Sequence, residues 1–184
     1  WAPGIYPASA SATVNIKQEN GVIRSRITSS NIYDHQGAVL ELKNKITGDF
    51  EVIVDLKNEF SSAAWSDTVL VFHDDSWNNN FHIALRKAVD SPYQLAQGVV
   101  VNGQGQDSAT IALDNSGPVT VKLKRIGNKV EYYYKNSTGQ FILFATKTDA
   151  FLGDGRIALV INSWPTNFPS VTSTFDNFSG KVNF

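Results

Sequence analysis

The amino-acid sequence predicts an all-β protein made of two antiparallel sheets packed face to face. Apolar and polar residues alternate in segment after segment, which is the period of a strand with one buried face. Turn signals rich in Gly and Asn separate these segments at short intervals. Helical periodicity is scarce throughout the 184 residues. Many short strands, each with one buried face, are typical of a β-sandwich.

In the first half of the chain the alternation is clearest over residues 23–27, 50–57 and 81–86. Residues 68–73, TVLVFH, are instead apolar on both faces, as expected of a central strand covered on both sides. The segment HDDSWNNN at 73–80 is therefore predicted to be the hairpin turn between two central strands. Asn suits such a turn because it tolerates the left-handed backbone conformation.

In the second half, alternation predicts strands over 119–124 and 157–161. Between them, VEYYYK at 130–135 places one tyrosine on the opposite face from its two neighbours. The nearby cations Lys122, Lys124 and Arg125 are expected on the outer surface beside the outward tyrosine face.

One domain is expected to span residues 1–184, because no linker or internal repeat interrupts the pattern. The opening residues 1–13 contain prolines and small side chains, which predict an extended N-terminal arm along the domain.

Composition excludes several classes of function. A net charge of −1 gives no electrostatic footprint for nucleic acid or an acidic membrane, and no apolar run approaches a membrane span. Absence of cysteine excludes disulfides and thiolate metal sites. The abundance of Asn, Ser, Thr and Gly, with few charges, favours an exported protein that is extracellular or at the cell surface.

The order of these segments resembles the concanavalin A-like lectin/glucanase superfamily of jelly-roll sandwiches, especially its laminin-G-like and carbohydrate-binding-module branches. The resemblance covers nearly the whole chain and implies a concanavalin A-like jelly roll in which the first and last strands pair. Members include glycoside hydrolases and non-catalytic sugar-binding modules. The matching pieces are KRIGN at 124–128, YYY at 132–134, GRIAL at 155–159, FDNF at 175–178, and the segments 48–57 and 68–87.

Catalysis is not favoured by the residues. Hydrolases of the superfamily carry Glu-x-Asp-x-x-Glu on one strand, which points the carboxylates into one cleft, and this spacing is absent. The nearest acidic pair, Glu51 and Asp55, belongs to the solvent side of its strand. Sequence motifs of serine hydrolases, zinc proteases and phosphate-binding loops are also missing. The three histidines fit hydrogen-bonded strand residues better than metal ligands.

A structural calcium ion is implied by the resemblance, with an acid near the last strand as its ligand. Asp176 occupies that position. The alternative is a turn acid that accepts backbone N–H groups. Asp74 and Asp75 are weaker calcium candidates because their spacing lacks the glycine and the distant glutamate of an EF-hand loop.

Sugar binding requires flat apolar rings for stacking and short polar groups for hydroxyls. Three of the four tryptophans lie in polar, loop-like segments, although each could instead close an end of the sandwich. The predicted carbohydrate-binding surface consists of Trp65, Trp77, Trp164, Asp75, Asn79 and Arg86.

The favoured function is therefore a non-catalytic, lectin-like module that binds a polysaccharide or glycan, carried by an exported multidomain enzyme or adhesin. A structural or protein-binding domain of the same fold is one alternative. A glycoside hydrolase with an atypical carboxylate arrangement is the other.

Overall fold

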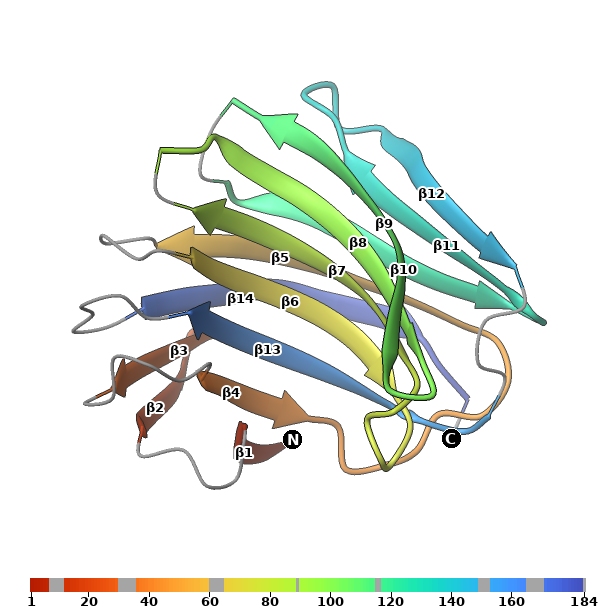
Figure 1. The fold of residues 1–184 in the computed structure, drawn as a ribbon, viewed down its shortest axis with the longest axis horizontal. Helices are drawn as coiled ribbons and strands as arrows, with labels where there is room; N and C mark the ends of the chain where they lie inside the picture. The colour runs from red at the N-terminus through yellow and green to blue at the C-terminus, as the bar shows by residue number, and fades with distance from the viewer. Residues whose placement is uncertain are drawn as a thin grey trace.

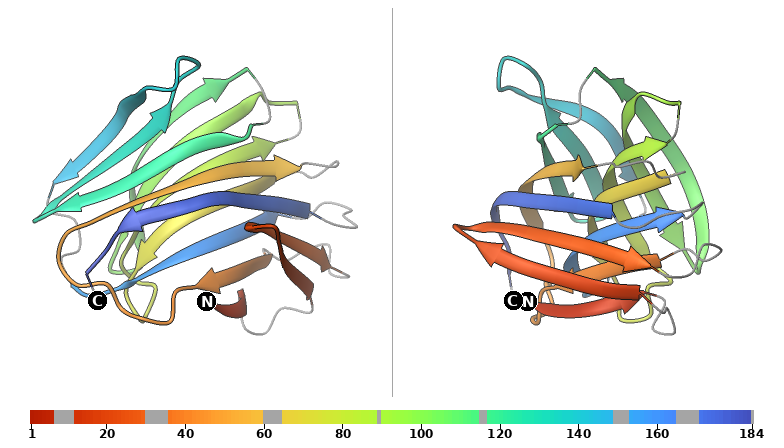
Figure 2. Two further views of the ribbon diagram at one scale, coloured as in Figure 1. Left: turned by 180° about the vertical axis from the view of Figure 1, so that it is seen from behind. Right: turned by 90° about the vertical axis from the view of Figure 1, so that its left-hand side faces the viewer.

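The structure is a computed structural model that describes residues 1–6, 12–29, 36–59, 65–88, 90–114, 117–148, 153–164 and 171–183. Within these ranges there are fourteen strands and no helix, so no helix is long and apolar enough to cross a membrane. The strands form two antiparallel seven-stranded sheets that lie face to face (Figures 1 and 2). The predicted two-sheet sandwich is confirmed.

Sheet A carries the central hairpin, and the described strands follow one another across it in an order that differs from the sequence order. This order is β1 (Ala2–Tyr6), β4 (Gln36–Glu41), β13 (Arg156–Trp164), β6 (Trp65–His73), β7 (Asn80–Ala88), β8 (Tyr93–Val101) and β9 (Gln104–Leu113).

Sheet B forms the second layer. Its order is β12 (Phe141–Thr148), β11 (Lys129–Lys135), β10 (Val119–Ile126), β5 (Phe50–Glu59), β14 (Val171–Lys181), β3 (Val22–Ser29) and β2 (Ala12–Glu19).

The main core lies between the sheets and is filled by the inward residues of the alternating strands. Burial along β5 alternates residue by residue, as its sequence predicts. Phe50 of β5 stacks on Phe72 of β6 with 5.0 Å between ring centroids, and Phe72 stacks on Phe81 of β7 at 4.9 Å. Three stacked rings thus bridge the two layers at the strands that the sequence placed centrally.

Strand β6 is buried on both faces from Ser66 to His73, which confirms the covered central strand. Its inner face joins the main core. Its outer face contributes to a second apolar cluster, on the outside of sheet A, against which Trp77 packs. The buried members of this outer cluster are Val69, Val71, Ala84, Ala158 and Val160.

Two expectations are corrected. The first and last strands do not pair, because β1 pairs with β4 in sheet A while β14 lies between β5 and β3 in sheet B. Trp1 still reaches the last strand, since its ring meets Phe178 edge-on at 5.1 Å. Arg125 does not lie on the outer surface but is buried on the core side of β10.

The predicted arm at residues 1–13 contains β1 and the first residues of β2, and residues 7–11 lie outside the described residues.

Candidate functional site

The pairing register brings three rows of side chains together on the outer face of sheet A. The middle row is apolar, and each flanking row contains polar groups. The rows are Asn162, Asp67 and Arg86, then Val160, Val69 and Ala84, then Ala158, Val71 and His82.

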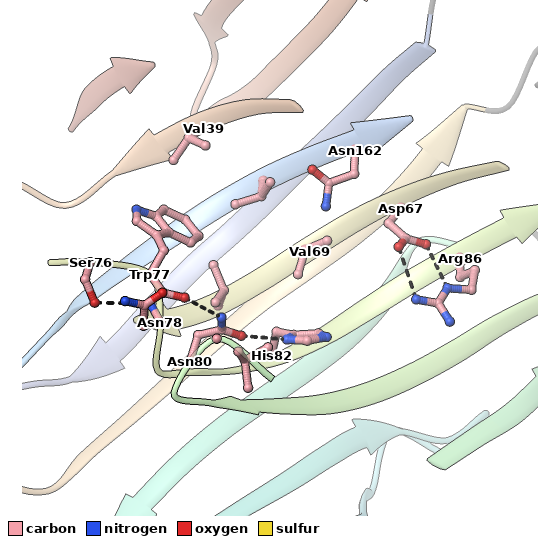
Figure 3. Close-up of a pocket in the computed structure, with 14 residues that line it drawn as sticks. Val39, Asp67, Val69, Ser76, Trp77, Asn78, Asn80, His82, Arg86 and Asn162 are labelled. Atoms are coloured by element: carbon pink, nitrogen blue, oxygen red, sulfur yellow. Dashed lines mark hydrogen bonds and ion pairs between the residues drawn. The ribbon is translucent and has the colours of Figure 1, made fainter. Parts of the chain in front are cut away.

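A cavity of about 550 Å³ lies over these rows (Figure 3). Its volume falls within the usual range for small-ligand sites. Four valines, Val39, Val69, Val71 and Val160, form an apolar floor. The β6–β7 hairpin forms a wall on one side. The cavity therefore combines an apolar floor with polar groups around it.

Trp77 supplies the aromatic part of this wall. Its backbone has a positive φ of 61°, and its N–H donates to the Asp74 carbonyl at 3.1 Å within the turn. Its ring stacks on the buried His73 ring with 3.6 Å between centroids and 16° between planes. The predicted stacking residue at the hairpin tip thus lines the cavity, and its ring is held by the ring beneath it.

His73 is a support rather than a wall residue. Its Nδ1 lies 2.7 Å from the Asp74 carbonyl oxygen. Its Nε2 lies 3.0 Å from a Glu41 carboxylate oxygen, although that contact lacks the alignment of a hydrogen bond. Burial lowers the pKa of His73, which favours the neutral ring.

Arg86 stands at the far side of the floor from the hairpin. Its guanidinium donates to both carboxylate oxygens of Asp67, at 2.9 and 3.2 Å. The same guanidinium lies 4.3 Å from the ring centroid of Trp65, and the Trp65 indole N–H donates to Asp67 at 3.1 Å. Predicted residues Trp65 and Arg86 are therefore brought together through Asp67, with Arg86 lining the cavity directly.

His82 contributes a hydrogen-bond acceptor. Asn80 donates its amide to the Trp77 carbonyl at 3.2 Å, which turns its oxygen toward His82 Nδ1 at 3.0 Å. Nδ1 then carries the proton, and Nε2 is left as an acceptor. Burial lowers the pKa of His82 to about 4, so the ring is neutral at neutral pH. The ring lies over Gly98, where an added Cβ would stand 2.6 Å from Nε2.

Asp75 and Asn79 lie outside the cavity lining. The exposed Asp75 forms salt bridges with Lys45, at 2.6 Å, and with Arg156. The Asn79 amide donates to Asp74 at 2.8 Å, and its oxygen accepts the backbone N–H of Asn102 at 3.0 Å. Both residues therefore brace the hairpin.

The backbone of Trp164 pairs with that of Trp65 at the ends of β13 and β6, and its side chain is outside the described residues. The polar residues Asn80, His82 and Asn162 line the cavity but were not in the predicted set. Two of them could have been found from the sequence, because a period of two from Arg86 passes through His82 and Asn80.

Asp176 lies on sheet B, away from the cavity, where it pairs in register with Asp55. Its Oδ1 accepts the N–H of Asn177 at 2.7 Å, and the Asn177 amide donates to Asp55 at 2.7 Å. These side chains supply only part of the six to eight oxygens that calcium takes. In the described part of the chain no group of three or more His, Asp or Glu residues could hold a metal.

Comparison with protein families finds no matching family model, and comparison with curated proteins finds no match. Solved structures do match. The carbohydrate binding module CBM66 from Bacillus subtilis has a TM-score of 0.61 and 12% identity, covering 94% of this chain and 96% of that one. A β-1,3-1,4-glucanase (lichenase) from a mouse hindgut metagenome has a TM-score of 0.64 and 13% identity, covering 98% and 92%.

A third match is the CBM2 module of the evolved Dit protein of Lactobacillus casei BL23 phage J-1. It has a TM-score of 0.60 and 13% identity, covering 94% of this chain and 81% of that one. At such low identity the likeness concerns the fold. The chain therefore has the concanavalin A-like jelly-roll fold that its segment order predicted.

Proposed function

We propose that this domain is a non-catalytic, lectin-like carbohydrate-binding module whose site is the cavity on the outer face of sheet A. The observation that carries the proposal is that one cavity combines the Trp77 ring, an apolar floor of valines and polar side chains around them. Binding modules and glucanases with the same jelly-roll fold are consistent with a carbohydrate-related role.

The chemistry of a sugar matches these groups. The C–H face of a pyranose can lie against the Trp77 indole or the valine floor, because both present apolar surface. The hydroxyls of the sugar then face both hydrogen-bond donors and hydrogen-bond acceptors. The Asp67–Arg86 pair offers an acceptor and a donor, and His82 Nε2 offers an acceptor. The bidentate ion pair leaves little net charge at that end of the site, which favours a neutral sugar.

A binding role is favoured over hydrolysis by the carboxylates. Glycosidases use two carboxyl groups on either side of the scissile bond. Among the described residues that line the cavity, Asp67 is the only carboxylate, and Arg86 holds both its oxygens. A carboxylate fixed in this way is poorly suited to act as a general acid, because its proton-accepting oxygens are occupied by a cation.

The test is a glycan array followed by calorimetry on the variant Trp77→Ala. Loss of one stacking ring should weaken binding by about 1–3 kcal/mol, the scale for burying a large apolar side chain. Tyr133→Ala is the matched control, since Tyr133 is an aromatic residue of β11 in the other sheet. An unchanged affinity in a folded Trp77→Ala protein would place the site elsewhere, and binding of no glycan would favour the protein-binding alternative.

Hydrolysis is tested separately by prolonged incubation with polysaccharides. No reducing sugar should be released. Release that disappears in Asp67→Asn or in a Glu51→Gln variant would instead support the hydrolase alternative.

We also propose that the module works outside the cell, attached to other domains, with one structural calcium ion at Asp176. The Asn-, Ser- and Thr-rich composition supports the first part. The register that places Asp55 directly opposite Asp176 on paired strands supports the second.

A further inference from the structure

We propose that the outer face of the β2–β3 hairpin is a second binding site, one that takes an anionic polysaccharide bearing carboxylate or sulfate groups. This hairpin forms one edge of sheet B (Figure 1). The cavity described above lies on the outer face of sheet A. The second site does not depend on the proposed function of the first.

The register of the hairpin brings three cations together. Lys17 lies directly opposite Arg24, and Asn15 lies directly opposite Arg26. Because residues two apart along a strand share a face, Lys17, Arg24 and Arg26 belong to one surface. Alternation along β3 buries Ile23, Ser25 and Ile27 and leaves both arginines exposed.

This surface is hollowed. A cavity of about 400 Å³ is lined by the three cations together with Asn15, Asn20 and Glu19. The cations suit acidic groups, and the amides and carboxylate suit hydroxyls. An acidic sugar presents both kinds of group on one ring.

The juxtaposition of Lys17 and Arg24 is unfavourable for the fold itself. Like charges directly opposite each other on paired strands destabilise a sheet. Among the described residues neither Lys17 nor Arg24 forms a salt bridge, and Glu19 is the only carboxylate that lines the cavity beside them. An anion seated between the two cations would relieve their repulsion, so the pair is better explained by a ligand than by folding.

A polysaccharide is favoured over nucleic acid as the source of the anion. No aromatic ring lines this cavity among the described residues, and stacking on aromatic rings is the usual means of holding single-stranded bases.

The experiment measures binding of polygalacturonate fragments and of heparin by calorimetry at physiological salt, with uncharged dextran as the neutral polymer. The key variant is Arg24→Glu. Losing a charge-assisted contact should weaken binding roughly tenfold to a hundredfold. The same substitution replaces the repulsive pair with an attractive one, so the melting temperature should stay equal or rise.

The matched control is Lys43→Glu, which makes the same charge change at an exposed residue outside the hairpin. It should keep full affinity, as should Trp77→Ala in the other sheet. Binding to polygalacturonate would show that carboxylates are sufficient, and binding to heparin alone would show that sulfate groups are required, because heparin carries both.

Three outcomes would overturn the inference. One is that neither acidic polysaccharide binds. Another is that Lys43→Glu and Arg24→Glu weaken binding equally, which would indicate a general charge effect. The last is equal binding of polyglutamate, which would point to an acidic peptide instead.

Discussion

Among single residues, His82 shows how burial sets the chemistry of one side chain. An unperturbed histidine has a pKa near 6.5, and burial lowers that of His82 to about 4. The unfolded chain therefore binds a proton more readily than the folded chain between these values. The contribution of the neutral His82 ring to the free energy of unfolding is therefore complete above about pH 6.5 and is lost as the pH falls toward 4.

We expect the free energy of unfolding to fall by at most about 3 kcal/mol from this residue between pH 7 and pH 4. The measurement is urea unfolding across that range in the wild type and in His82→Gln. The variant should lose less stability on acidification than the wild type. Burial also lowers the pKa of His73, so His73 contributes to the loss of stability in both proteins. Identical pH dependence in the two proteins would contradict the assignment.

The burial of the Arg125 side chain could not be predicted from the sequence. It continues the inward positions Val119, Val121 and Leu123, yet a cation at that position was expected to face solvent. The structure buries it because its guanidinium donates to the Gly48 carbonyl and, at 2.9 Å, to the Gly153 carbonyl, while lying 4.9 Å from the Phe72 ring centroid. These acceptors come from distant loops, so local alternation could not reveal them.

Among the elements, the β6–β7 hairpin was predicted closely, since β6 ends at His73 and β7 begins at Asn80. The sequence could not show which polar residues of the turn face the cavity. Asn79 is used to join the hairpin to the next turn through Asn102, and that partner is 23 positions away. The role of a turn residue is thus decided by a contact that no short window contains.

We expect Asn79→Ala to loosen the hairpin that carries Trp77. Losing its two hydrogen bonds should lower the free energy of unfolding by about 1–3 kcal/mol. Glycan binding should also weaken, because Trp77 is held less firmly, although Asn79 itself does not line the cavity. Chemical unfolding and calorimetry measure the two effects. Asp75→Ala is the control, because the salt bridges of this exposed carboxylate are screened by solvent and should contribute less to stability than the two hydrogen bonds of Asn79. Equal stability of the two variants would show that Asn79 does not brace the hairpin.

In the whole molecule, period-two patterning was enough to predict two sheets and their buried faces. It was not enough to predict strand order. β13 inserts between β4 and β6, and β14 inserts between β5 and β3, so the central pairings join segments from opposite ends of the chain. Such pairings depend on three-dimensional packing, and the expected pairing of first and last strands was wrong for that reason.

The calcium proposal concerns these long-range pairings, since Asp176 and Asp55 meet only where β14 pairs with β5. A ligand that binds only the folded state adds about 2.7 kcal/mol at a hundredfold excess over its dissociation constant. For a domain of this size that corresponds to a rise of roughly 5–10 °C in melting temperature.

Melting in calcium and in excess chelator should therefore differ by this amount in the wild type. The difference should vanish in Asp176→Asn and persist in Asp75→Asn, which removes an acid outside the proposed site. An unchanged melting temperature on addition of chelator, together with no metal in elemental analysis, would contradict the calcium proposal. Asp176 would then be a turn acid that accepts the Asn177 N–H.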